Sequence, residues 1–124
     1  MSNTAQRFGS RIIRSATPLP SLQAASDHAA TDTHIMRPTS VESLPARNDW
    51  LHEWRDATGI VTLQLAASDT AGYILRVPAL CDFLIDTSSQ TVHPICVDAV
   101  TETTFEHLLI DQILPRVLAS AGEL

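Results

Sequence analysis

The C-terminal stretch TFEHLLIDQILPRVLASAGEL, residues 104–124, constrains the fold most, because it predicts a helix that is apolar on two opposite sides. At about 100° per residue, two separate apolar rows form on the helical wheel. One row holds Phe105, Leu109, Ile113 and Val117, and the other holds Ile110, Leu114, Leu118 and Ala121. A helix that is apolar all round belongs inside a larger assembly. We therefore expect a single sheet to cover one side only. The other side, with Ile110, Leu114 and Leu118, either packs on the N-terminal strands or contacts a partner, and we expect the partner.

The limits of this helix are predicted from capping residues, which place it over residues 101–121. Thr103 and Glu106 have the spacing of a capping box, and Gly122 is a suitable C-terminal stop. Pro115 lies inside the helix and has no N–H to donate to the preceding turn. We therefore expect a kink near Pro115.

The body before the helix, residues 9–97, is predicted to be rich in strands, after a loose terminus at residues 1–8. Apolar residues alternate with polar ones in IVTLQLAAS, which indicates a half-buried strand. Turn-forming residues separate further short strands, and Pro94 predicts an edge or a break in the last of them. The predicted strands cover residues 9–15, 33–38, 60–68, 73–78, 79–86 and 90–97.

These elements together predict an α+β fold of a single domain, residues 1–124. We expect an antiparallel β-meander of about five or six strands with one main C-terminal helix packed on it. The two N-terminal strands are expected to join the same sheet.

Composition excludes several classes of function. The formal charge of −6 argues against nucleic-acid binding, which needs a basic surface. The chain has no Lys, and its four Gly are scattered, so the phosphate-binding loop G-x-x-x-x-G-K-[ST] cannot be formed. No apolar run reaches the ~18 residues that a membrane span needs. We therefore expect no cofactor, no nucleic-acid partner and no membrane insertion.

Two cysteines, Cys81 and Cys96, lie in apolar strand-like runs without a C-x-x-C motif. This pattern is typical of buried free thiols in a reducing compartment. We therefore expect a cytoplasmic protein.

Histidines and carboxylates leave one enzymatic alternative open. The five His are scattered without metal-ligand spacing, so we expect no metal site. His52, Glu53 and Asp56 are close together in the sequence and could serve a small stand-alone enzyme of the hydrolase type. That hypothesis requires a cleft that gathers the three groups.

Residues 73–124 resemble the segment that precedes the P-loop in bacterial HPr-kinase-like serine kinases, relatives of HPr kinase/phosphorylase. The opening FGSRIIRSATPLPSL is similar to the first strand and turn of that family, whereas residues 23–60 match it only loosely. Among the matching positions, we expect structural roles for Arg76, Asp82, Phe83, Asp111 and Pro115.

This resemblance implies the family's N-terminal accessory domain with its linking helix, without the kinase core that carries ATP and Mg²⁺. The full-length proteins of this family are ATP-dependent serine kinases. We expect no catalysis from this chain alone, because none of its residues corresponds to the P-loop. The resemblance implies a non-catalytic binding or regulatory module that docks on a kinase core, on a substrate protein or on a second copy of itself. An idle remnant of a truncated kinase gene is the remaining alternative.

Overall fold

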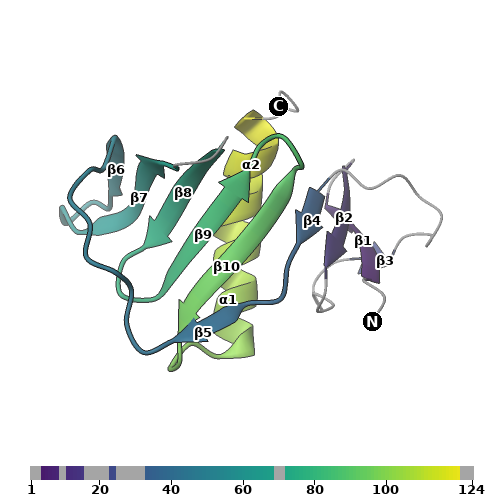
Figure 1. Ribbon diagram of the computed structural model, residues 1–124, viewed down its shortest axis with the longest axis horizontal. Coiled ribbons are helices and arrows are strands. Elements are labelled where there is room, and N and C mark those ends of the chain that lie inside the picture. Colours follow the sequence, from purple (N-terminus) through teal and green to yellow (C-terminus); the bar gives the residue numbers. More distant parts are fainter. Residues whose placement is uncertain (1–3, 9–10, 16–22, 25–32, 69–71, 121–124) are drawn as a thin grey trace.

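The computed structural model describes residues 4–8, 11–15, 23–24, 33–68 and 72–120. Within them the chain is α+β, with a mixed sheet and one C-terminal helical run (Figure 1). The strands follow the order β3-β1-β2-β4-β10-β9-β8-β7-β6, and β5 pairs with β10 outside this path.

Five antiparallel strands form the meander, and the sequence predicts four of them, β7 to β10. They are β6 (His52–Arg55), β7 (Val61–Ala67), β8 (Gly72–Val77), β9 (Cys81–Asp86) and β10 (Thr91–Val97). Side chains alternate along β7, where Leu63 is buried and Thr62 is exposed. Strand β6 was not expected in the sequence, and it forms one edge of the sheet.

The outer edge of β10 is shared by two short strands that run parallel to it, β4 (Thr33–Ile35) and β5 (Thr39–Val41). Strand β4 pairs with β10 at Thr91 and Val92, and β5 pairs with it from Ile95 onward. Pro94 lies between these two pairings, where its missing N–H removes no ladder hydrogen bond to either short strand. The prediction that Pro94 marks an edge or a break is wrong, because β10 continues through it and has neighbouring strands on both sides. What changes at Pro94 is the neighbour, from β4 to β5.

The N-terminal strands join the same sheet through β4. They are β1 (Thr4–Phe8), β2 (Arg11–Ser15) and β3 (Gln23–Ala24). Strand β2 runs parallel to β4, and β1 pairs antiparallel with both β2 and β3. The prediction of a loose terminus is wrong for residues 4–8, because β1 has a neighbouring strand on each side. Residues 1–3 lie outside the described part of the chain.

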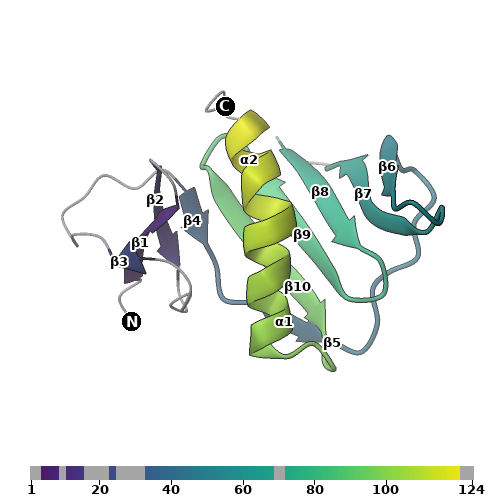
Figure 2. The same cartoon turned by 180° about the vertical axis from the view of Figure 1, so that it is seen from behind.

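One helical run crosses the face of the sheet seen in Figure 2. It consists of α1 (Glu102–Leu108), a π-helical turn η1 (Leu109–Ile113) and α2 (Leu114–Ser120). Phe105 stacks on Phe83 of β9 with ring centroids 6.0 Å apart. The buried core lies between this helix and the strands; its helical members are Phe105, Leu109, Ile113, Leu114 and Val117.

The π turn overturns the predicted distribution of apolar residues on the helix. Leu114 donates its backbone N–H to the Leu109 carbonyl, five residues back, so these two side chains lie on one face. A regular α-helix would separate them by about 140°. Leu114 therefore joins the core, and the described helix has an exposed flank, formed by Glu102, Thr103, His107 and Asp111. The π turn lies directly before Pro115, near which the sequence predicted a kink.

The helix begins with a cap that differs from the predicted one. Thr101 is the N-cap, and its hydroxyl accepts a hydrogen bond from the Thr104 N–H at 3.2 Å. The predicted capping box at Thr103 and Glu106 is therefore wrong, because both residues lie inside the helix. Gly122 lies outside the described residues.

We expect Thr101→Ala to lower the free energy of unfolding by about 1 kcal/mol, because it leaves the Thr104 N–H without its cap. Urea denaturation followed by circular dichroism measures this loss. The matched control is Thr103→Ala, which changes an exposed threonine inside the first turn and should have a smaller effect. Equal losses in both variants would contradict the assignment of Thr101 as the cap.

Candidate functional site

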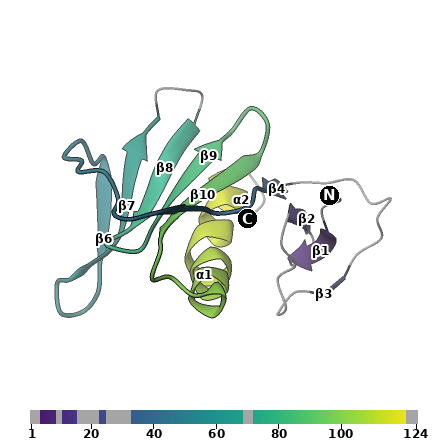
Figure 3. The ribbon, with the colours of Figure 1, turned by 60° about the horizontal axis from the view of Figure 1, so that its bottom comes forward.

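The connection between β5 and β6, residues 42–51, crosses the sheet on the side away from the helix, and we call it the strap (Figure 3). Strand β5 precedes the strap and strand β6 follows it, and a backbone hydrogen bond fixes each end. At its start, the Asp98 N–H donates to the Val41 carbonyl at 2.9 Å, and at its end the Leu51 N–H donates to the Leu65 carbonyl at 2.7 Å. The strap has no regular secondary structure, so its course depends on these ends and on contacts with the sheet below.

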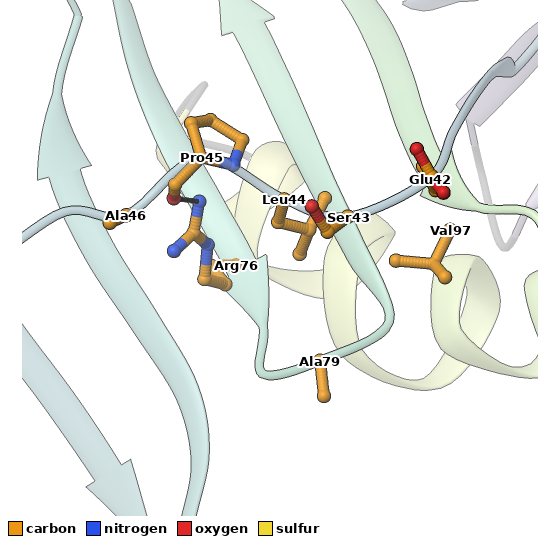
Figure 4. A pocket seen from close by; sticks show the side chains of 8 residues that line it. All are labelled: Glu42, Ser43, Leu44, Pro45, Ala46, Arg76, Ala79 and Val97. Atoms are coloured by element: carbon orange, nitrogen blue, oxygen red, sulfur yellow. Dashed lines mark hydrogen bonds between the residues drawn. The ribbon is translucent and has the colours of Figure 1, made fainter.

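A pocket of about 410 Å³ opens between the strap and the sheet (Figure 4). The strap supplies one wall, β8 and the turn after it supply a second, and the end of β10 closes the far side. The lining residues are Glu42, Ser43, Leu44, Pro45, Ala46, Arg76, Ala79 and Val97.

Arg76 of β8 joins the strap to the sheet. Its Nε and Nη2 donate to the two carboxylate oxygens of Asp82 at 2.6 and 2.9 Å, a bidentate pair between neighbouring strands. Nη2 also donates to the Pro45 carbonyl of the strap at 2.7 Å. The Trp50 ring lies 5.0 Å from the guanidinium carbon, within the range of a cation–π contact. One buried side chain thus holds the strap at two points.

Local sequence explains why this ion pair forms. Arg76 lies between the apolar residues Leu75 and Val77, and Asp82 lies between Cys81 and Phe83. Side chains alternate along each strand, so both charged residues point away from the helix-facing core. The hairpin pairs Arg76 with Asp82 directly, and its hydrogen bonds raise the pKa of Arg76 above the ordinary value. Because each charge neutralises the other, the floor of the pocket carries little net charge.

The walls of the pocket are mainly apolar, and one carboxylate, that of Glu42, is among its lining residues. Leu44 and Val97 contribute aliphatic side chains, and the left-handed backbone of Ala79, with φ of 65°, turns the chain below them. The exposed Glu42 carboxylate lies at the rim. Asp98 is also exposed. Its carboxylate accepts a hydrogen bond from the Ser40 hydroxyl, and its backbone N–H donates to the Val41 carbonyl. This arrangement suits an apolar side chain that is accompanied by a positive charge.

The hydrolase-type residues do not converge on this pocket or on each other. The His52 ring packs edge-on against Trp54, with centroids 4.5 Å apart. Glu53 accepts hydrogen bonds from Gln64 at 2.7 Å and from Arg55 at 3.2 Å. Each of the two candidate groups is therefore engaged by its own neighbours.

Asp56 caps its own turn. Its carboxylate accepts from the Thr58 hydroxyl at 2.6 Å, the Thr58 N–H at 2.8 Å and the Ile60 N–H at 3.1 Å. The Thr58 hydroxyl and the backbone N–H groups hold the pKa of Asp56 below its ordinary value. A general base works best with a pKa near neutral, so this carboxylate is poorly suited to that role.

The predicted partner residues on the helix have different surroundings. Leu114 is fully buried in the core, which corrects its expected place in an interface, because a partner cannot reach it. Ile110 is partly buried and packs against the same core. The side chain of Leu118 lies outside the described residues.

The positions that carry the kinase resemblance fall into two groups. Arg76 and Asp82 meet in the buried ion pair, and Phe83 stacks on Phe105 beneath the helix. Asp111 is exposed on the π turn, and Pro115 is half-buried just after it.

The strap and its pocket were not predicted, because residues 42–51 lie between the predicted strands 33–38 and 60–68 and show no strand or helix pattern. The signal that could have revealed them is a pair of opposite charges, Arg76 and Asp82, inside two apolar strands that a single turn connects. Such charges need partners when buried, and the strap supplies one of them.

No protein-family model matches this chain, and neither the curated proteins nor the solved structures contain a match to it. Among the described residues, no three His, Cys, Asp or Glu side chains are grouped so that they could hold a metal ion. No helix in the described part of the chain is both long and apolar enough to cross a membrane.

Proposed function

We propose that this protein is a non-catalytic binding module that uses the strap pocket to hold a protein partner. The observation that carries the proposal is the pocket itself, with apolar walls over a neutralised arginine and the exposed Glu42 carboxylate at its rim. A partner that inserts an aliphatic side chain next to a Lys or Arg would complement both features. The buried ion pair serves this role by presenting the strap in one conformation before the partner arrives, which reduces the entropy cost of binding.

The partner that we propose is the catalytic core of an HPr-kinase-like serine kinase. The resemblance of residues 73–124 to the segment before the P-loop in these enzymes motivates this choice. Arg76, Asp82 and Phe83 belong to that resemblance, and each supports the sheet next to the pocket or beneath the helix. The proposal includes a cytoplasmic location, which agrees with two free thiols in the described chain. It includes no nucleotide binding by this chain alone.

Calorimetric titration with an isolated catalytic core of this kinase family tests the proposal. We expect a saturable heat with the core present, and only the heat of dilution when ATP is added to this protein alone. Ser43→Trp should weaken the binding of the core at least about tenfold, because an indole at this exposed lining position fills the pocket.

The matched control is Ala57→Trp, which places the same side chain on the exposed turn between β6 and β7. It should bind the core as the unaltered protein does. Equal binding by the Ser43 and Ala57 variants would exclude the pocket as the contact surface. If sedimentation showed that the protein forms dimers that Ser43→Trp disrupts, the occupant would be a second copy and the kinase core would be the wrong partner.

A further inference from the structure

Cys81 and Cys96 lie directly opposite each other on neighbouring antiparallel strands. The register of β9 and β10 pairs their Cα atoms, and both residues are free thiols. Cys81 is 0% exposed and Cys96 is 7% exposed. Because the register pairs the two residues, their side chains lie on the same face of the sheet, toward the helix. Both side chains belong to the core between the sheet and the helix.

The hydrogen-bond register brings these cysteines into the range of a disulfide. The next pair along the strands is joined by a hydrogen bond from the Val97 N–H to the Leu80 carbonyl at 2.8 Å. Bonded and non-bonded pairs alternate in an antiparallel ladder, so Cys81 and Cys96 occupy a non-bonded position. The Cα atoms of such a pair are about 4.5 Å apart. Disulfides join Cα atoms that are roughly 4.4–6.8 Å apart, so the crosslink needs little movement of the backbone.

We propose that Cys81 and Cys96 are a site of reversible oxidation, at which a small hydroperoxide such as hydrogen peroxide forms a cross-strand disulfide. The sulfur of Cys96, the more exposed residue, attacks one oxygen of the peroxide. The O–O bond breaks, a sulfenic acid forms, and the other oxygen leaves as water with the thiol proton. The sulfur of Cys81 then attacks the Cys96 sulfur, the S–O bond breaks, and the hydroxyl leaves as a second water with the Cys81 proton. Two electrons pass from the thiols to the peroxide.

The surroundings of the pair support this order of events. The neighbouring Cys96 thiol and burial raise the pKa of Cys81, whereas the neighbouring Cys81 thiol lowers the pKa of Cys96. The thiolate is the nucleophile toward peroxides, so the first attack is favoured at Cys96. Cys81 is already in contact with it and resolves the sulfenic acid before a second oxidation.

The crosslink would form in the helix-facing core, at the same end of β9 and β10 as the strap pocket but on the opposite face of the sheet. Ala79 and Val97, which line that pocket, are close neighbours of the two cysteines in the sequence. A disulfide at this point would fix the ends of β9 and β10 that support these walls. Disulfides in a reducing cytoplasm are usually transient and redox-sensing, and a pair held as thiols in contact is suited to that use. The chemistry of the pair does not depend on the identity of the partner.

Treatment of the folded protein with hydrogen peroxide tests the inference. Intact mass should fall by the mass of two hydrogens, and a non-reducing peptide map should join the segments that contain Cys81 and Cys96. After treatment, neither cysteine should react with iodoacetamide in denaturant, and dithiothreitol should restore both reactions. Crosslinking should be at least about tenfold faster in the folded protein than in urea, because folding holds the sulfurs together.

The control variant is Cys81→Ser, which should gain oxygen at Cys96 and form no internal crosslink. Three results in the unaltered protein would overturn the proposal without reference to any variant. They are two alkylatable thiols after treatment, oxygen adducts in place of the crosslink, and a disulfide that joins only separate chains.

Discussion

Replacing Arg76 with alanine should lower the free energy of unfolding by about 3 kcal/mol, because it leaves Asp82 charged and buried without its partner. The carboxylate loses both hydrogen bonds from the guanidinium, and the strap loses its bond at the Pro45 carbonyl. Urea denaturation followed by circular dichroism measures the loss. The loss of stability lies at the lower end of the range for breaking a buried ion pair, because Arg76 borders the open pocket.

The double variant Arg76→Met with Asp82→Leu distinguishes the cost of the unpaired Asp82 charge from the cost of the lost hydrogen bond to the strap. It removes both charges and keeps similar volume, so most of the stability should return. The strap would still lack its arginine, and we expect it to become more susceptible to proteolysis around Pro45 than in the unaltered protein. A double variant as unstable as Arg76→Ala would show that the unpaired charge is not the source of the loss.

Leu114→Ala should also cost about 3 kcal/mol, because it removes a fully buried side chain from the core under the helix. The matched control is Ile110→Ala, which should cost about 1 kcal/mol, since Ile110 is only partly buried. Denaturant titration of both variants gives the comparison. A regular α-helix would place Leu114 far from the sheet-facing row, so a larger loss at Ile110 than at Leu114 would contradict the π turn.

The central meander could be predicted from the sequence because its information is local. In β7, apolar and polar residues alternate at the period of a strand, and turn-forming residues separate the hairpins. Strands β5 and β6 could not be predicted in the same way. They have three and four residues, and β5 is specified by a parallel partner far along the chain. Patterns within so few residues do not distinguish a strand from a connector.

The faces of the C-terminal helix could not be predicted from the sequence for a different reason. Its length and apolar character were evident, but the wheel assumed a constant rotation per residue. The π turn before Pro115 adds a residue to one turn and brings Leu114 toward the sheet. The candidate site was less predictable still, because the strap has no periodicity. Only Arg76 and Asp82, two charges within apolar strands, indicated that something polar had to cover this face.

The two short parallel strands on β10 impose an order on how the chain assembles. Each hairpin of the meander closes a short loop, so β7 to β10 can associate early, whereas β4 and β5 must reach β10 across the whole intervening sequence of β6 to β9. These late contacts rest on only a few ladder positions on either side of Pro94. Local unfolding that detaches these two strands from β10 can therefore leave the hairpins and the helix folded.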